Sequence, residues 1–364
     1  MSGSAFKSWS RTSPGEPFKQ VDVTAPGPEQ LGPHEMLVEN RAAALNPVDT
    51  QLSNMGLFKL SSLAHPKGVA ADFAGVVLAV GKQVSGFKQG DHVFGMQFQA
   101  MPKPAYGALS QVMIVDTKTS QVVIKPQHLS WQQAASLPLV WQTAATLLAE
   151  PNTILPPNIA TPTIVVLGGS SSVGMHVVQI AKSKLGAKVV ATCSSRNSEF
   201  VKADLGADIV IDYTSEDILS RLLDLRPDEG YTCIIDCVGG TELLSSLNQL
   251  LIKRTQEFPQ GGCYLTIVGD KTDRSVLGGA TIYMWHPWML LRYYKGRFGF
   301  GPRYACIDLE RRTTFLEDAI QLTKQGNFKI AIDSVFGFDD VLKAFDKLNS
   351  GRARGKVIVN IKDD

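Results

Sequence analysis

Residues 163–182 read TIVVLGGSSSVGMHVVQIAK, a run of β-branched residues followed by a turn of small residues and a helix with apolar spacing. Such a turn offers backbone N–H groups and the positive end of a helix dipole to a diphosphate. The strict G-x-G-x-x-G pattern is not met, because Ser171 takes the place of the middle glycine. An ordinary strand-to-helix turn is the alternative. We predict a dinucleotide-phosphate site at Gly168, Gly169, Ser170, Ser171, Ser172, Val173 and Gly174.

The following hundred residues alternate between apolar runs and helical patterns. The apolar runs are KVVATC (188–193), DIVIDY (208–213), YTCIIDCVG (231–239) and CYLTIVG (263–269). Nearly continuous runs of this kind are typical of parallel strands that helices cover on both faces. The pattern predicts an α/β fold with a doubly wound parallel sheet. We expect the chain after Gly269 to be irregular until a helix within 309–326.

The first 130 residues have a different pattern. EMLVENRAAAL (35–45), GVVLAVG (75–81) and DHVFG (91–95) are short apolar runs bounded by Gly, Pro or Asp, which predicts strands joined by tight turns. Helical spacing begins in WQQAASLPLVWQTAATLLAE (131–150), where Pro138 is expected to break or kink the helix. With 364 residues in all, two domains are expected.

Charge and cysteine content narrow the class of protein. Lys and Arg number 36 against 34 Asp and Glu, so nothing points to a nucleic-acid partner. The sequence contains no run of 18 apolar residues, so no transmembrane helix is expected.

The five cysteines all lie in the second half of the chain, which favours free, buried thiols in a reducing compartment. We expect a cytoplasmic protein, with a mitochondrial or membrane-surface location as the alternatives.

The end of the second predicted parallel strand distinguishes NAD from NADP. An acidic residue there would hold the ribose hydroxyls of NAD, but the stretch ATCSSRN (191–197) has none. Ser194, Ser195 and Arg196 offer hydroxyls and a guanidinium, which suit a 2′-phosphate. The alternative is a helix N-cap by Ser195 or Asn197 beside a solvated arginine. The missing acid and the cation together favour NADPH.

The sequence contains no recognisable metal or nucleophile motif. The first 190 residues have no cysteine, the six histidines are scattered, and Cys233 and Cys237 fit a buried strand better than a zinc site. We therefore expect no metal. The run GGSSSVG does not satisfy the G-x-S-x-G pattern of a hydrolase elbow.

Segments along most of the chain resemble one family. They are ALNPVDTQL (44–52), GVAADFAGVVLAVGKQVSGFKQGDHVFG (68–95), GALSQ (107–111), AASLPLVWQTAATLL (134–148), LGADIVIDY (205–213) and IDSVFGFDDVLKAFDKLNSGRARGKVIV (332–359). The chain resembles the zinc-free, quinone oxidoreductase-like (zeta-crystallin-like) branch of the medium-chain dehydrogenase/reductase superfamily. The resemblance is strongest to fungal members near trans-acting enoyl reductases. Zinc-dependent relatives carry Cys-His near Asn46 and His-Glu near Asp72, which this chain lacks.

The resemblance implies a domain plan and an activity. A β-rich, GroES-like catalytic domain would comprise residues 1–130 and be completed by 310–364. A Rossmann domain of residues 131–309 would bind NADPH, and the active site would lie in the cleft between the two. The implied reaction is hydride transfer to a quinone or an α,β-unsaturated carbonyl compound, the implied small-molecule substrate.

The resemblance also implies roles for single residues. Asn46, Asp49 and Thr143 would be catalytic, next to the nicotinamide, although Asn46 and Asp49 also fit an Asx-type turn. The turn of residues 168–174 would surround the pyrophosphate. The residues expected at the rest of the coenzyme are Ser194, Ser195, Arg196, Tyr213, Val238, Gly239, Val268, Gly269 and Lys356.

One departure from the family concerns proton donation. Mitochondrial enoyl thioester reductases of the superfamily carry a proton-donating tyrosine shortly after the Asn-Pro pair, where this chain has Leu57 and Phe58. A quinone or enone needs less help, because water can protonate the delocalised product. The alternatives are a trans-acting enoyl reductase that serves a polyketide synthase and a non-catalytic, membrane-associated protein that binds NADPH.

Residues 278–306 are rich in aromatic and basic side chains. Three interpretations remain open for them: a lid over an apolar substrate, an oligomer interface, or a surface that contacts a membrane. The protein is expected to be a monomer or a homodimer.

Overall fold

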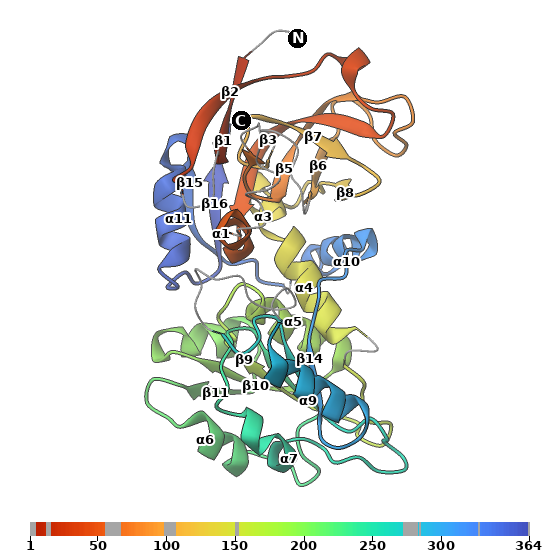
Figure 1. Cartoon of the computed structure of the whole chain (residues 1–364), viewed down its shortest axis with the longest axis vertical. Coiled ribbons are helices and arrows are strands. Elements are labelled where there is room, and N and C mark those ends of the chain that lie inside the picture. The colour runs from red at the N-terminus through yellow and green to blue at the C-terminus, as the bar shows by residue number, and fades with distance from the viewer. Residues whose placement is uncertain are drawn as a thin grey trace. The chain divides into compact units, whose positions relative to one another are not determined.

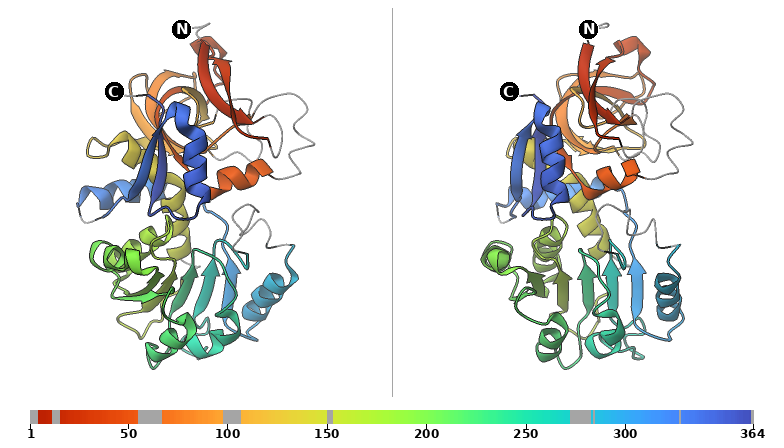
Figure 2. Two further views of the ribbon diagram at one scale, coloured as in Figure 1. Left: turned by 90° about the vertical axis from the view of Figure 1, so that its left-hand side faces the viewer. Right: turned by 60° about the vertical axis from the view of Figure 1, so that its left-hand side comes forward.

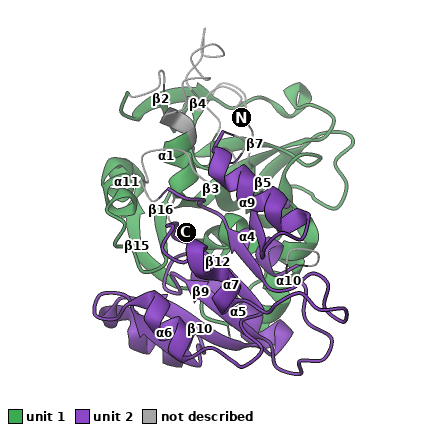
Figure 3. Cartoon of the chain, turned by 60° about the horizontal axis from the view of Figure 1, so that its bottom comes forward, with its two compact units in different colours: residues 1–142, 274–277, 311–364 green, residues 143–273, 278–310 purple. Residues whose placement is uncertain are grey.

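In the computed structural model the chain divides into two units, shown in green and purple in Figure 3. Unit 1 comprises residues 1–142, 274–277 and 311–364, and unit 2 comprises residues 143–273 and 278–310. The residues that the structure describes are 5–11, 16–54, 67–97, 107–149, 153–271, 283, 285–326 and 328–362.

Unit 2 is built on a six-stranded parallel sheet. Its strands are β9 (Thr163–Leu167), β10 (Lys188–Cys193), β11 (Ile209–Asp212), β12 (Cys233–Asp236), β13 (Cys263–Thr266) and β14 (Arg303–Cys306). They lie in the order β11-β10-β9-β12-β13-β14, and every pair is parallel. This is the strand order of a Rossmann fold. Successive strands are added on one side of β9 up to β11, and the chain then returns to add β12, β13 and β14 on the other side. The predicted doubly wound parallel sheet is confirmed.

Helices lie on either side of this sheet, as Figure 2 shows. They are α5 (Gly174–Leu185), α6 (Ile218–Asp224), α7 (Leu247–Leu250) and α9 (Pro287–Arg297). Short turns add η2 (Ser195–Asn197), the π-helical η3 (Phe200–Asp204) and η4 (Leu244–Ser246). Burial of both sheet faces is the reason why the strands read as unbroken apolar runs.

The prediction of an irregular segment after Gly269 was wrong for residues 287–306. They form helix α9 and the sixth strand, β14. The strand has only four residues, begins with Arg303, and pairs with β13 along one side. Its short length and its charged first residue leave almost no periodic signal in the sequence.

Unit 1 contains two sheets. The larger has the order β15-β16-β3-β5-β6-β8, with β7 paired to β3. Its strands are β3 (Glu35–Leu45), β5 (Asp72–Val80), β6 (His92–Met96), β7 (Val112–Asp116), β8 (Gln121–Ile124), β15 (Ile332–Gly337) and β16 (Lys356–Asn360). The smaller sheet joins β1 (Ala5–Arg11) to β2 (Lys19–Thr24) and β4 (Lys67–Gly68). Strand β16 pairs antiparallel with β3, so a strand from the C-terminal segment joins a sheet whose other central strands come from the first half of the chain.

The helices of unit 1 are short (Figure 1). They are α1 (Pro47–Asn54), α3 (Trp131–Ser136), α10 (Thr313–Lys324), α11 (Val341–Asn349), η1 (Pro28–Gln30) and η5 (Phe338–Asp340), and α4 (Pro138–Leu148) begins in this unit. The expected break at Pro138 is confirmed, because α3 ends at Ser136 and α4 begins at Pro138.

The boundary between the units lies after Gln142, instead of after residue 130 as expected. Helix α3 packs against β3, β5 and β16, which are strands of unit 1. Ser130 caps the helix by accepting a hydrogen bond from the Gln133 amide. Residues 131–142 therefore belong to the β-rich unit, because their apolar face is buried there.

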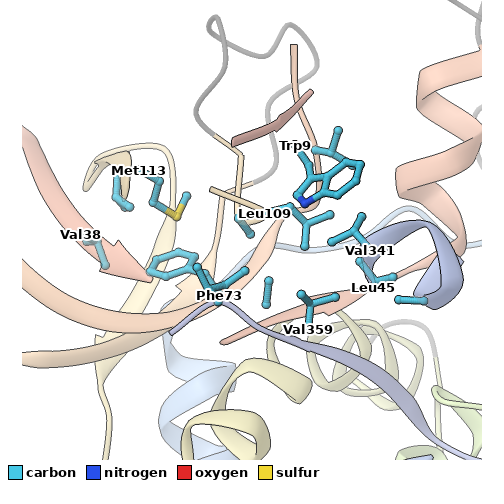
Figure 4. Close-up of a cluster of buried hydrophobic side chains, with 14 of the residues drawn as sticks. Trp9, Val38, Leu45, Phe73, Leu109, Met113, Val341 and Val359 are labelled. Atoms are coloured by element: carbon cyan, nitrogen blue, oxygen red, sulfur yellow. The ribbon is translucent and has the colours of Figure 1, made fainter. Parts of the chain in front are cut away.

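The core of unit 1 combines residues from both ends of the chain (Figure 4). Trp9 from β1, Phe73 from β5, and Val341 and Val359 from the C-terminal segment pack in one cluster. The Trp9 indole also donates a hydrogen bond to the Phe338 carbonyl oxygen at 2.7 Å. The C-terminal segment is thus part of the hydrophobic core and not an appendage.

Replacing Phe73 by Ala should destabilise the protein by about 3–5 kcal/mol, because the side chain is fully buried and its removal leaves a cavity. Urea unfolding measures the loss. Val335→Ala, at a half-exposed position in β15, is the matched control and should cost under about 1 kcal/mol. Equal losses for the two variants would contradict this assignment of the core.

Candidate functional site

The turn after β9 is held in place by the neighbouring strand. The Gly168 amide donates to Thr192 Oγ1 at 2.9 Å, and the Gly169 amide donates to the Thr192 carbonyl oxygen at 2.8 Å. Further along, the Ser171 hydroxyl accepts a hydrogen bond from the Gly174 amide at 3.0 Å. Thr192 of β10 and Ser171 therefore define the course of the main chain between strand and helix.

Two glycines in this turn have no room for a side chain. A Cβ atom on Gly168 would collide with the Val238 side chain, and the φ angle of +80° at Gly168 already disfavours other residues. A Cβ atom on Gly174 would collide with the Gly168 carbonyl oxygen. The result is a cradle of closely packed main chain at the start of the twelve-residue helix α5, in which residues 170–173 are half-buried. Such a cradle fits a diphosphate, which needs close main-chain donors and a helix N-terminus.

The remaining predicted coenzyme residues of unit 2 lie at the same edge of the sheet. Ser194, Ser195 and Arg196 follow β10, Tyr213 follows β11, Val238 and Gly239 follow β12, and Val268 and Gly269 follow β13. Because all six strands are parallel, their carboxyl ends meet along one edge, where doubly wound folds bind ligands. Arg196 and Ser195 are exposed, and Tyr213 is 54% exposed.

The alternative role for the Ser-Ser-Arg-Asn stretch differs from the structure in the residue at the N-cap of η2 and agrees with it in the exposure of Arg196. The N-cap residue of η2 is Ser194, and its side chain makes no cap hydrogen bond. Asn197 is buried and donates from Nδ2 to Ser170 Oγ at 3.1 Å. Asn197 thus connects the loop after β10 to the Gly/Ser turn.

The sequence analysis missed two aspartates that hold the loops of this edge. Asp236, at the end of β12, accepts hydrogen bonds from the amides of Val238 (3.0 Å) and Gly239 (2.7 Å) and from Thr266 Oγ1 (2.8 Å). The Thr266 hydroxyl in turn accepts from the Gly269 amide at 2.9 Å. Burial raises the pKa of the Asp236 carboxyl, and the two amide donors oppose that rise. One carboxylate and one hydroxyl thereby position the loops after β12 and β13.

Asp212, at the end of β11, is the second missed residue. It accepts hydrogen bonds from the Ser195 amide at 3.0 Å, from Thr214 Oγ1 at 2.7 Å and from Ser215 Oγ at 3.0 Å. The Thr214 hydroxyl bond is the largest of the causes that lower the pKa of this carboxyl. The signal in the sequence was an aspartate that ends an apolar strand, which also marks Asp236.

Unit 1 contains a buried polar cluster around Asn46. Lys356 Nζ lies 2.6 Å from Asn46 Oδ1 and 3.4 Å from Asp72 Oδ2. Asn46 Nδ2 donates to Asp72 Oδ2 at 2.9 Å, and the Asn46 amide donates to Asp49 Oδ2 at 2.7 Å. The Leu139 amide donates to Asp72 Oδ1 at 3.0 Å. Asn46 lies between β3 and α1, and the other side chains come from α1 (Asp49), β5 (Asp72) and β16 (Lys356).

Burial dominates the ionisation of this cluster. It raises the pKa of Asp49 to about 7 and also raises the pKa of Asp72, whereas it lowers the pKa of Lys356. The Lys356 ammonium partly offsets these shifts by attracting both carboxylates. Asp49 is therefore a group that can hold or release a proton near neutral pH.

The structure places Lys356 with Asn46, Asp49 and Asp72 in unit 1, and the other predicted coenzyme residues lie in unit 2. Thr143, on α4, is buried and belongs to unit 2. Leu57 and Phe58, at the position of the family's proton-donating tyrosine, lie outside the described residues.

Within the described part of the chain, no group of three or more His, Cys, Asp or Glu side chains could hold a metal ion. The five cysteines are free and buried. Among the described residues, no helix is both long and apolar enough to span a membrane.

Gly174→Ala should weaken binding of a nicotinamide dinucleotide at least tenfold, because the added Cβ displaces the turn from Gly168. Titration calorimetry measures the dissociation constant. Gly186→Ala, at the other end of the same helix, is the control: its Cβ meets nothing within 4 Å, so it should lower stability by about 1 kcal/mol and leave binding unchanged. Equal binding by both variants would contradict a phosphate site at the turn.

Asp49→Asn should have a larger free energy of unfolding than the wild type, and the difference between the two should grow as pH rises. The folded-state pKa of Asp49 is about 7 against 3.8 for the free group, so wild type loses stability across that window while the neutral amide does not. The difference in unfolding free energy should grow by an amount on the order of 4 kcal/mol. Urea unfolding at several pH values measures it, with the exposed Asp346→Asn as control. A difference that does not change with pH would show that Asp49 is charged throughout.

Two family models match the chain. The model described as alcohol dehydrogenase GroES-like domain matches residues 32–127, and the model described as zinc-binding dehydrogenase matches residues 205–359. The first match lies on the β-rich unit and the second begins within the Rossmann sheet of unit 2.

Curated relatives match nearly the whole chain. Protein YIM1 of Vanderwaltozyma polyspora is 31% identical, over 90% of this chain and 91% of its own length. The 2-methylene-furan-3-one reductase of Solanum lycopersicum is 32% identical, over 98% and 79%. The mitochondrial NAD(P)H oxidoreductase RTN4IP1 of Homo sapiens is 31% identical, over 90% and 82%.

A solved structure also matches nearly the whole chain. The quinone oxidoreductase from Coxiella burnetii superposes with a TM-score of 0.77 at 25% identity, over 99% of this chain and all of that one. The relatives and this structure are named as oxidoreductases or reductases, apart from Protein YIM1. Together with the Rossmann sheet and the GroES-like unit, they show that the chain belongs to the medium-chain dehydrogenase/reductase superfamily and is an enzyme of its quinone oxidoreductase-like, NAD(P)H-dependent group.

Proposed function

We propose that this enzyme reduces quinones or α,β-unsaturated carbonyl compounds with NADPH and without zinc. The observation that carries the proposal is the tight glycine turn of residues 168–174, which leads from β9 directly into the N-terminus of helix α5. The substrate class is supported by two names. One neighbour is a quinone oxidoreductase, and the tomato relative is named for a 2-methylene-furan-3-one, a ketone conjugated with a methylene group.

The choice of NADPH rests on the loop after β10. Ser195 and Arg196 are exposed there and can reach a 2′-phosphate with a hydroxyl and a guanidinium. The Asp212 carboxylate lies under the Ser195 amide, and its oxygens accept hydrogen bonds from Ser195, Thr214 and Ser215. Arg196 is the exposed cation that this loop can offer to the ligand.

When bound, the reduced nicotinamide supplies the hydride. The chain's own residues hold the coenzyme and manage the proton. Asp236 and Thr266 keep the loops at Val238–Gly239 and Val268–Gly269 in place for the nicotinamide ribose and carboxamide. Both polar atoms of the Asn46 side chain are held by hydrogen bonds, since Oδ1 accepts from Lys356 and Nδ2 donates to Asp72.

Asp49 is the member of the unit 1 cluster suited to proton transfer. Its pKa of about 7 lets the carboxyl give up or take a proton at neutral pH, whereas Asp72 is engaged with the Lys356 ammonium. Hydride addition to a quinone or enone leaves a delocalised oxyanion, which takes one proton from this carboxyl or from water. We propose a cytoplasmic location on the basis of the free thiols, with the mitochondrion as the alternative that one relative's name carries.

A scan of NADPH oxidation tests the proposal against its rivals. Turnover with quinones or 2-alkenals is the expected result. Turnover with enoyl thioesters alone would favour an enoyl reductase that serves a synthase, and tight NADPH binding without any turnover would favour an accessory protein. Either of the last two outcomes would contradict the proposed substrate class.

Arg196→Ala should weaken NADPH binding about ten- to a hundredfold and leave NADH binding unchanged, because only the 2′-phosphate uses the guanidinium. Titration calorimetry with both coenzymes measures the effect. Lys184→Ala removes an exposed cation near the far end of α5 and serves as the control. Tighter binding of NADH than of NADPH by the wild type would rule out the assignment.

A further inference from the structure

Helix α9 of unit 2 exposes an unusual set of large apolar side chains. We call Trp285, Trp288, Leu291, Tyr294, Phe298 and Phe300 the aromatic face. Trp285 is 84% exposed, Trp288 64%, Phe298 68% and Phe300 82%. These six are nearly half of the thirteen large hydrophobic side chains that are exposed in the described part of the chain. Isolated exposed apolar residues need no explanation, but a concentration of this kind marks an interaction surface.

The opposite side of α9 is anchored, so the aromatic face cannot turn inward. Met289 is fully buried, and Gly296 packs so closely that a Cβ atom would collide with the Pro302 carbonyl oxygen. The Arg292 guanidinium bonds to Asp270 and lies 4.9 Å from the centre of the Tyr304 ring. The spacing of Trp288, Leu291 and Tyr294 places them on one side of the helix, away from Met289 and Gly296.

The exposed charged side chains on α9, Lys295 and Arg297, are both cations. Between Asp273 and Asp308 the sequence has no acidic residue, although the whole chain carries a net charge of only +2. The aromatic face is therefore surrounded by cations without compensating carboxylates from its own segment.

This charge pattern distinguishes between partners. In a symmetric dimer both copies use the same patch, so a dimer through α9 would bring Lys295 and Arg297 of both copies into one interface, with no carboxylate from this segment. Like charges placed opposite each other in an interface are costly. An anionic surface would instead attract both cations, and aromatic rings and long cationic side chains are the groups that settle at the boundary between lipid headgroups and acyl chains.

We propose that the aromatic face docks on an anionic lipid bilayer. The eleven-residue helix, about 16 Å long, would lie along the bilayer plane, with the rings of the aromatic face, on the helix and on the residues flanking it, among the headgroups. Lys295 and Arg297 supply the electrostatic attraction, which weakens as salt screens it. The proposal is independent of the reductase activity, because it uses no residue of the coenzyme site.

Vesicle flotation of the full chain tests it. The protein should float with vesicles of phosphatidylcholine mixed with phosphatidylserine, and not with vesicles of phosphatidylcholine alone. Trp285→Ala/Trp288→Ala should lower the partition coefficient at least about tenfold, through the apolar area lost. Lys295→Gln/Arg297→Gln should lower it about 25-fold, and added salt should reduce wild-type binding.

The matched control is Val335→Ala/Leu342→Ala, which removes apolar side chains exposed on unit 1 and should float like wild type. NADPH binding and thermal unfolding of the tryptophan variant check that unit 2 is intact, because both tryptophans lie outside its core. The proposal is overturned if the wild type does not float, if it binds neutral and anionic vesicles equally, or if the tryptophan variant floats normally. It is also overturned if that variant turns a dimer into a monomer, by sedimentation velocity, while the wild type shows no vesicle binding.

Discussion

The close approach of the turn after β9 to its neighbours is the constraint on which the coenzyme site depends. Thr192 takes hydrogen bonds from two successive glycine amides, so the turn follows the end of β10 without an intervening side chain. Gly168 and Gly174 leave no space for a Cβ atom. Because the turn is this tight, helix α5 starts directly at the carboxyl edge of the sheet, the position at which a helix N-terminus favours an anion.

Two buried aspartates show how unit 2 and unit 1 use charge differently. Asp236 accepts hydrogen bonds from two backbone amides and a hydroxyl, and in this way it fixes two loops. Asp72 faces the Lys356 ammonium, and Asn46 bonds to both. Burying an ion pair costs desolvation that the attraction only partly repays, so the pair is better understood as fixing the position of Asn46 than as a source of stability.

The features that could be predicted from the sequence are those that repeat locally. Unbroken runs of Val and Ile identified β9 to β13, and small residues next to one of these runs identified the turn. Strand β14 escaped prediction because four residues headed by Arg303 carry no period, and helix α3 was given to the wrong unit because its apolar face does not say which sheet it covers. Asp212 and Asp236 were missed because their partners, Ser195 and Thr266, come from other strands.

The sequence by itself determined the parallel α/β class, the glycine turn and the absence of an acid after the second parallel strand, since each depends on residues adjacent in the chain. Only the tertiary structure decided that Lys356 meets Asn46 and Asp72, because pairing of β16 with β3 joins residues some three hundred positions apart. It likewise decided which face of α9 is buried, because the packing of Met289 and Gly296 onto unit 2 selects one side of a helix that is apolar on more than one. Local propensity acts between neighbours, whereas burial and charge pairing are settled only when distant segments come into contact.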